Sequence, residues 1–374
     1  MSIRVVVVDD SVVIRRLVVQ VLESDPNFEV VGTAANGRLA LTKVEQLAPD
    51  VVTMDIEMPQ MNGVEAVREL RTRGFKMPII MFSTLTERGA TATLDALTAG
   101  ASDYVAKPAN MGSVTESLQA VAEQLIPKIK SLVAGKVTRT KIGVSAPRGT
   151  AATTLLPGLS AMHSQARAVI RTDQKSHPVH AVVVGSSTGG PEALSKLIEA
   201  MPNALPVPML ITQHMPPLFT KQLAARLDRI GPHRVFEVAD GQVISPGGIY
   251  IAPGDFHFTL TNVTGIVRAR LNQDPPVNFC RPSVDVMFRS ALEVYGAKLL
   301  SVMLTGMGSD GKAGAGAIVE HGGTVIVQDE QTSVVWGMPG AVATAGYAHR
   351  ILPLSELGST ITGLTREQRV QRGD

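Results

Sequence analysis

The sequence predicts an α/β protein built from two parallel-sheet domains. Apolar runs rich in valine and isoleucine alternate with helical patterns, and many of these runs end directly on polar residues. A long stretch without clear periodicity, residues 126–177, divides the chain. Strands that alternate with helices are typical of doubly wound parallel sheets, whose ligands gather at the carboxyl ends of the strands. The length of 374 residues fits two or three domains.

Composition and charge exclude several classes of protein. Hydrophobic residues make up 44% of the chain, enough for sizeable cores, and the formal net charge of +2 argues against a general polyanion-binding protein. The single cysteine, Cys280, excludes an internal disulfide framework and CxxC-type metal sites. There is no signal-peptide pattern, and no apolar run approaches the roughly 20 residues that a bilayer requires. We expect a cytoplasmic protein without membrane insertion.

The first 125 residues predict five strands in alternation with helices. The expected strands are 3–8, 29–33, 49–54, 77–82 and 101–106, and helical patterns cover 14–22 and 37–47. Polar residues follow four of these strands: Asp9 and Asp10, Asp55, Ser83, and Lys107 before Pro108. Aspartates at strand ends are often simple turn formers, but that role does not explain an ordered set that includes a lysine.

Three carboxylates at one edge of a sheet repel each other unless a cation neutralises them, and hard oxygen ligands suit Mg²⁺. A carboxylate beside Mg²⁺ and a lysine can accept a phosphoryl group, because both cations stabilise the charge on the transferring oxygens. These residues and Met58-Pro59 make residues 1–125 resemble a two-component receiver domain. The resemblance implies that Asp55 is the phospho-acceptor and that Asp10 binds Mg²⁺ with help from Asp9 and the Glu57 carbonyl. It also implies that Ser83 and Tyr104 are switch residues and that Lys107 pairs with the phosphate.

Residues 126–177 have the composition of a basic flexible linker. From 127 to 177 there are nine basic side chains and one acidic residue, Asp173, among many small and polar residues. A loop of this length is improbable inside a compact domain, so we place a domain boundary here. Its positive charge could contact an acidic partner, although a solvated tether is the simpler interpretation.

The second domain, residues 178–365, again shows an α/β pattern. Expected strands are 179–184, 207–212, 298–304 and 324–328, with a helix beginning at 282. Between them, glycine and proline punctuate short β-rich runs from 235 to 271, which predict antiparallel hairpins in or beside the parallel sheet.

A glycine-rich turn lies between the first of these strands and the next helix. Gly185-Ser186-Ser187-Thr188-Gly189 fits the G-x-S-x-G nucleophile elbow, which exposes a serine hydroxyl near the free N–H groups of a helix N-terminus. Such turns more often bind phosphate or are merely tight. A P-loop or dinucleotide site is disfavoured here because the P-loop lysine and the G-x-G-x-x-G spacing are both missing.

Two further strands of this domain end near residues that suit acyl-transfer chemistry. His214 and Asp310 each follow a strand, as Ser187 does, so a nucleophile, a base and an orienting acid are expected at one rim. Taken alone, His214 would be an ordinary loop histidine and Asp310 a turn residue. Cys280 is a rival nucleophile, although Arg281 and the absence of flanking glycines favour a buried or substrate-edge role.

The motifs 185–190, 213–215, 280–285 and 304–311 make this domain resemble the catalytic domain of the chemotaxis receptor methylesterases. The resemblance implies hydrolysis of glutamyl methyl esters, and deamidation of some glutamines, on chemotaxis receptors. It implies Ser187, His214 and Asp310 as the triad and the Thr188 and Met307 N–H groups as the oxyanion hole, with no cofactor for hydrolysis. A chemotaxis histidine kinase would supply the phosphate. A DNA-binding output would require a basic helix-turn-helix, which this half does not show, so no nucleic-acid partner is expected.

Overall fold

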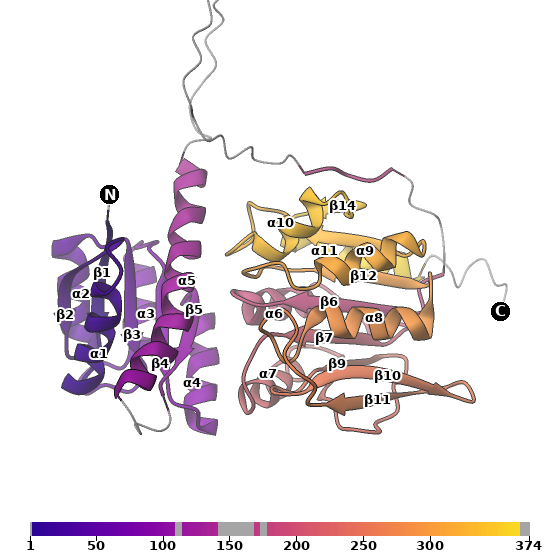
Figure 1. The fold of residues 1–374 in the computed structure, drawn as a ribbon, viewed down its shortest axis with the longest axis horizontal. Coiled ribbons are helices and arrows are strands. Elements are labelled where there is room, and N and C mark those ends of the chain that lie inside the picture. The colour runs from indigo at the N-terminus through magenta and orange to yellow at the C-terminus, as the bar shows by residue number, and fades with distance from the viewer. Residues whose placement is uncertain (1, 109–113, 141–167, 173–177, 367–374) are drawn as a thin grey trace, which may run out of the picture.

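The computed structural model describes residues 2–108, 114–140, 168–172 and 178–366, and it shows two α/β domains side by side (Figure 1). The first domain is a five-stranded parallel sheet in the order β2-β1-β3-β4-β5. Its strands are β1 (Ile3–Val8), β2 (Phe28–Ala34), β3 (Val51–Asp55), β4 (Ile79–Ser83) and β5 (Asp103–Ala106). The predicted doubly wound architecture is confirmed.

The helices of this domain begin at polar caps. They are α1 (Val12–Glu23), α2 (Gly37–Leu47), α3 (Gly63–Thr72), α4 (Glu87–Thr98) and α5 (Val114–Thr140). In the first four, a side-chain oxygen of the N-cap residue accepts a backbone N–H of the first turn; these caps are Ser11, Asn36, Asn62 and Thr86. Such caps satisfy donors that the helix itself cannot, and they fix where each helix leaves the strand before it.

Helix α5 continues well beyond the point where sequence periodicity fades. It includes Pro127 and ends at Thr140, so the first part of the expected linker is helical. Leu125, Ile129 and Leu132 are buried and pack in one cluster with α1 and the sheet. Tertiary packing therefore extends the helix past the proline. Of the expected linker after Thr140, only residues 168–172 are described, and the flexible tether remains a prediction.

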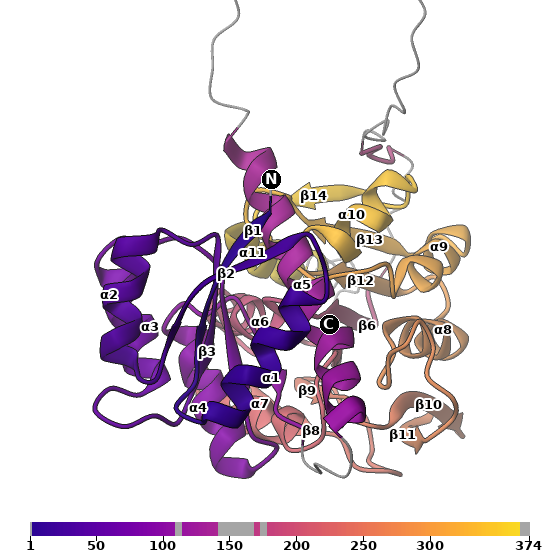
Figure 2. The same cartoon turned by 60° about the vertical axis from the view of Figure 1, so that its left-hand side comes forward.

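The second domain is built on a seven-stranded sheet in the order β14-β13-β12-β6-β7-β9-β8. Its strands are β6 (Ala181–Ser186), β7 (Met209–Gln213), β8 (Arg234–Glu237), β9 (Gly248–Ile251), β12 (Leu299–Met303), β13 (Thr324–Gln328) and β14 (Arg350–Leu352), all paired in parallel. The helices are α6 (Gly190–Glu199), α7 (Phe219–Leu227), α8 (Val284–Tyr295), α9 (Lys312–Glu320), α10 (Gly337–Thr344) and α11 (Leu354–Arg366). They lie on both faces of the sheet, so its central strands are buried (Figure 2).

The expected antiparallel region is smaller than the sequence suggests. β10 (His257–Val263) and β11 (Ile266–Asn272) form one antiparallel hairpin, but β8 and β9 join the main sheet in parallel. Every residue of β9 is buried. A short apolar run of this kind suits a strand covered on both faces, and it cannot be told from a hairpin strand by composition alone.

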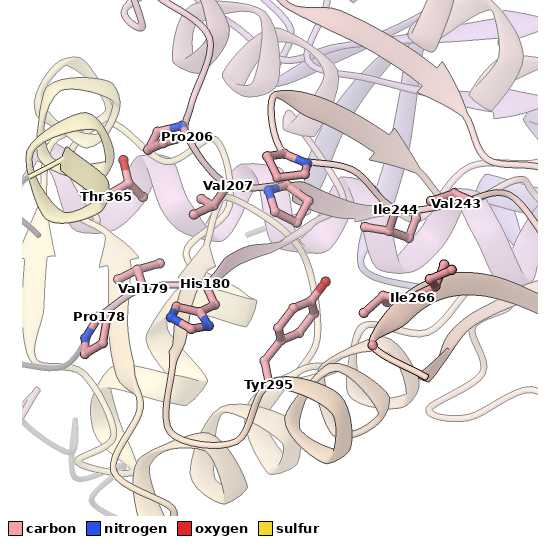
Figure 3. A pocket seen from close by; sticks show the side chains of 14 residues that line it. Pro178, Val179, His180, Pro206, Val207, Val243, Ile244, Ile266, Tyr295 and Thr365 are labelled. Carbon is pink, nitrogen blue, oxygen red and sulfur yellow. The ribbon is translucent and has the colours of Figure 1, made fainter. Parts of the chain in front are cut away.

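A groove of about 540 Å³ opens at the amino ends of β6 and β7 (Figure 3). It is lined by Val179, Val207, Ile266 and Tyr295, among others. Ser187 and His214 follow the carboxyl ends of the same two parallel strands, so the groove and these residues lie at opposite ends of the strands. Within the described ranges, no helix is long and apolar enough to span a membrane.

Candidate active site

Ser187 lies in a tight turn between β6 and α6. Gly189, the N-cap of α6, has a φ of 76°, and Pro191 follows in the first turn of the helix. The Ser187 N–H donates to the Thr305 carbonyl at 3.0 Å, while its own carbonyl accepts from Gly190 N–H and from Gln213 Nε2. The turn is therefore fixed from both sides, and it joins a strand to a helix N-terminus as the sequence predicts; the positive φ in it belongs to Gly189.

His214 follows β7, which is the neighbour of β6. Ser186 pairs with Gln213 in the parallel register, so Ser187 and His214 occupy equivalent positions just beyond the two strands. His214 Nε2 lies 2.8 Å from Asp310 Oδ2. Since Asp310 uses Nε2, Nδ1 is the imidazole nitrogen that remains for the serine proton. The structure brings the three residues to one rim, as the sequence predicts.

The Asp310 carboxylate is buried and surrounded by donors. Besides His214, it accepts the Val284 and Asp285 N–H groups at the start of α8, the Ser283 hydroxyl and the Asn278 amide; Gly311 N–H is a further donor. Burial alone would raise the pKa of Asp310, but hydrogen bonding and charge interaction with His214, together with the other donors, lower it to about 2. The carboxylate therefore stays ionised and holds the imidazole in place.

Cys280 lies at the other side of the imidazole. Its Sγ is 3.5 Å from His214 Nδ1, the nitrogen that would take the serine proton. Burial favours the neutral imidazole, but the interactions with Asp310 and Cys280 outweigh it and raise the pKa of His214 to about 9. The raised pKa favours the protonated imidazole, and only the neutral form can act as a base.

Two backbone N–H groups are available for an oxyanion. Within the described part of the chain, the Thr188 and Met307 N–H groups have no protein acceptor. The loop that carries Met307 approaches the serine closely, because a Cβ on Gly306 would lie 2.9 Å from Ser187 Cβ and 2.3 Å from Met338 Sδ. Glycine at 306 thus allows the approach that an oxyanion hole at Ser187 requires.

The first domain holds the acidic cluster expected from its sequence. Asp9, Asp10 and Asp55 each present a carboxylate oxygen within 4.8 Å of the others. Lys107 Nζ lies 2.7 Å from Asp55 Oδ1 and 3.1 Å from Asp9 Oδ2. Burial, reinforced by the Asp9 charge, raises the pKa of Asp55 to about 6 against the opposing effect of Lys107. An open cleft of about 610 Å³ beside the cluster is lined by Asp10 and Glu57.

The two predicted switch residues contact groups other than Asp55. The buried Ser83 hydroxyl lies 3.1 Å from the Gly89 carbonyl and 2.7 Å from the Thr93 hydroxyl, both on α4. The Tyr104 ring stacks on Phe219 of the second domain, with centroids 4.9 Å apart and planes 9° from parallel. Tyr104 therefore takes part in the contact between the domains.

Sequence reasoning did not assign a role to three residues that the structure places at the site. Gln213 joins both strand ends, since its side chain contacts the Ser186 hydroxyl and the Ser187 and His214 carbonyls. Asn278 donates to both Asp285 and Asp310. Asp103 accepts from the Thr188 hydroxyl across the domain boundary at 2.7 Å. Gln213 precedes His214 in a recognised motif, but no local pattern marks Asn278 or Asp103.

Comparison with known proteins matches two parts of the chain to two family models. Residues 5–119 match the family model described as "Response regulator receiver domain", and residues 182–361 match "CheB methylesterase". A "protein-glutamate methylesterase/protein-glutamine glutaminase" of Nocardioides sp. is 57% identical over 370 residues, which span 98% of this chain and 97% of the relative. One from Trichodesmium erythraeum is 44% identical, with 96% and 97% covered.

A crystal structure of the Thermotoga maritima CheB methylesterase catalytic domain is 44% identical, covers 50% of this chain and all of that one, and has a TM-score of 0.49. The fold and the two family matches define a response regulator with an enzymatic output domain. The chain belongs to the family of CheB protein-glutamate methylesterases/protein-glutamine glutaminases.

The raised pKa of His214 predicts how ester hydrolysis depends on pH. The base must be neutral, so the rate of the unphosphorylated protein should increase with pH and level off above about 9. Cys280→Ala removes one of the interactions that hold the proton, so the midpoint should move to lower pH. The pH profile of methanol release from both proteins measures this, and an unmoved midpoint would show that the thiol does not influence His214.

Substitution of Asp310 should impair catalysis more than folding. Asp310→Asn replaces one carboxylate oxygen with an NH₂ group, which is a donor and would face the other donors around this site. This should lower the free energy of unfolding by about 1–3 kcal/mol. Loss of the imidazolium partner should reduce turnover by about 10³–10⁴-fold. Denaturant titration and methanol release measure the two effects, with the exposed Asp274→Asn as control. A near-normal rate would remove the aspartate from the triad.

Proposed function

We propose that this chain hydrolyses glutamyl γ-methyl esters on chemotaxis receptors, deamidates certain receptor glutamines in the same site, and is switched on by phosphorylation of Asp55. The assignment is supported above all by the convergence of Ser187, His214 and Asp310 at one rim, in a member of this family. A cytoplasmic location and a chemotaxis histidine kinase as phosphodonor complete the proposal.

In the first half of the reaction, Ser187 Oγ attacks the ester carbonyl carbon while His214 Nδ1 takes the hydroxyl proton. The negative charge that develops on the carbonyl oxygen is stabilised by the Thr188 and Met307 N–H groups. Asp310 stabilises the imidazolium through Nε2. Collapse of the tetrahedral intermediate breaks the bond to the methoxy group, which leaves as methanol with the proton from His214.

In the second half, water replaces the leaving group. His214 takes a proton from the water while the water oxygen attacks the carbonyl carbon of the glutamyl-serine ester. When the bond to Ser187 Oγ breaks, His214 gives that proton to Oγ. The product is a receptor glutamate. A glutamine side chain passes through the same acyl-enzyme with ammonia as leaving group, so one serine serves both reactions.

The acidic cluster of the first domain fits a magnesium-assisted phosphoryl transfer to Asp55. Receiver domains bind Mg²⁺ as a family. The carboxylates of Asp9, Asp10 and Asp55 supply the hard oxygens that this ion prefers, and the Glu57 carbonyl would complete the set. The ion would neutralise charge on the phosphoryl oxygens. Lys107, already paired with Asp55, would shift to the phosphate.

In the unphosphorylated state, the first domain would inhibit the second by covering its rim. The two domains contact each other at Thr188 and Phe219, as described, and through α4 and α7. Arg226 on α7 donates to Asp95 Oδ1 at 2.9 Å and to the Thr98 hydroxyl at 2.6 Å on α4. Thr188 is both an oxyanion-hole residue and a partner of Asp103, so the covering domain reaches the reaction site itself.

Strand β5 offers a direct route from phosphorylation to this contact. Asp103 and Tyr104, which contact the second domain, begin the strand whose end leads to Lys107. Movement of Ser83 and Lys107 toward a phosphate on Asp55 would free space for the Tyr104 ring and weaken its stacking on Phe219. About 1.4 kcal/mol of differential stability between docked and released states suffices for a tenfold activation.

Removal of the nucleophile tests the reaction assignment. Ser187→Ala should reduce methanol release from methylated receptor membranes by about four orders of magnitude or more, because no group replaces the attacking oxygen. The control is Ser309→Ala, an exposed serine of the neighbouring loop, which should be near normal. If Ser187→Ala remained active and Cys280→Ala did not, the serine mechanism would be wrong.

A charge reversal at the domain contact tests the inhibition. Arg226→Glu places an acid beside Asp95, so the unphosphorylated full-length protein should become several-fold more active and respond less to a phosphodonor. Asp55→Asn should keep low activity with no response. The exposed Arg350→Glu, on β14 at the far edge of the sheet, is the matched control. Unchanged basal activity in Arg226→Glu would contradict inhibition through this surface.

A further inference from the structure

A strained turn, residues 277–280, lies beside Asp310 and His214. Val277 and Cys280 exchange two backbone hydrogen bonds, of 3.1 and 2.9 Å, and close a two-residue turn. Both central residues have positive φ angles, 52° for Asn278 and 63° for Phe279, which is the type I′ conformation. Asparagine tolerates this conformation, but glycine is favoured at the second position, and a bulky aromatic residue there is an outlier.

Both neighbours of Phe279 are attached to the catalytic machinery. The Asn278 amide donates to Asp310 Oδ1 and to Asp285 Oδ2, each at 2.9 Å. On the other side, Cys280 Sγ lies 3.5 Å from His214 Nδ1. The position and direction of Phe279 are thus set by the same residues that position the base.

The phenylalanine ring itself contributes nothing to the core. Phe279 has a relative exposure of 104%, the highest among the exposed large hydrophobic residues of the described chain. The ring is presented to solvent, although the backbone conformation disfavours it and water disfavours its apolar surface. Strain held in place beside an active site points to a role in function, and an exposed aromatic residue points to binding.

We propose that Phe279 is the anchor that binds the receptor segment carrying the ester. The occupant is the receptor segment around the modified glutamate, and an apolar side chain of that segment would pack on the exposed ring. Packing of that side chain on the ring would direct the ester toward Ser187. This inference rests on the proposed function of Ser187 and adds a determinant for the protein substrate.

The first domain leaves this anchor accessible. Phe279 is fully exposed with both domains in place, while the first domain contacts the second at Thr188, Val335, α6 and α7, among others. Phe279 should therefore contribute to receptor binding in the phosphorylated and the unphosphorylated protein alike. This separates it from residues that act only through release of the first domain.

The test compares a protein substrate with a small one, using the full-length protein. Methylated receptor membranes report on recognition, and 4-nitrophenyl acetate reports on the triad. Phe279→Gly and Phe279→Asn remove the ring but suit the left-handed turn, so both should fold with no loss of melting temperature. We expect KM for receptor membranes to rise about tenfold or more, while turnover of the small ester is retained. Phe279→Trp should restore receptor demethylation.

Two controls separate the possible outcomes. Val263→Ala, an exposed apolar residue at the tip of the β10–β11 hairpin, should leave both activities unchanged. Ser187→Ala should abolish both, and its failure to do so would refute the proposed function rather than the anchor. Normal receptor demethylation by Phe279→Gly and Phe279→Asn would overturn the proposal. Equal loss of both activities would also overturn it, because the residue would then act by positioning the triad.

Discussion

The candidate active site depends on one buried carboxylate, that of Asp310. Removing a charge from water is costly unless donors replace the lost hydration. Here the donors come from the start of α8, from Ser283 and Asn278, and from His214. Each of these groups is thereby held in a fixed position. Because Asn278 is itself part of the turn that carries Phe279 and Cys280, the carboxylate orders His214, the neighbouring thiol and the exposed aromatic ring together.

The same end of the second sheet carries the candidate catalytic residues and a contact with the first domain. Parallel pairing brings the ends of β6 and β7 together, which places Ser187 beside His214. The turn after β6 also exposes the Thr188 hydroxyl, and Asp103 of the first domain accepts from it. Lys128 pairs with Asp103 from α5 and donates to the Tyr104 carbonyl. In the proposed mechanism, a phosphate on Asp55 would therefore act on Thr188 through β5 and the residues that contact it.

Sequence reasoning succeeded where the signal is local and failed where it depends on tertiary packing. Parallel sheets bring strand ends together, and the predicted site residues follow strongly apolar strands. The pairing of Asp9 with Asp55 in the first domain, and of Ser187 with His214 in the second, could therefore be predicted. The parallel pairing of β9 and the length of α5 are set by burial against distant elements. The use of Nε2 by Asp310 likewise depends on side-chain geometry. Asp103 and Asn278 act across domains and loops, where no sequence spacing marks them.

In our proposals, entry of the ester to Ser187 and binding of the receptor at Phe279 use different sides of this surface. The first domain contacts the Thr188 side of the nucleophile, whereas Phe279 projects on the side where Asn278 and Cys280 hold its turn. A regulator that covered the whole surface would have to lose every receptor contact in the inactive state. In the proposed mechanism the first domain blocks the ester from the Thr188 side, so the protein could stay bound to its substrate through Phe279 while inactive. Phosphorylation would then need to move only one domain by a small free-energy difference, and the activated enzyme would already be beside its target.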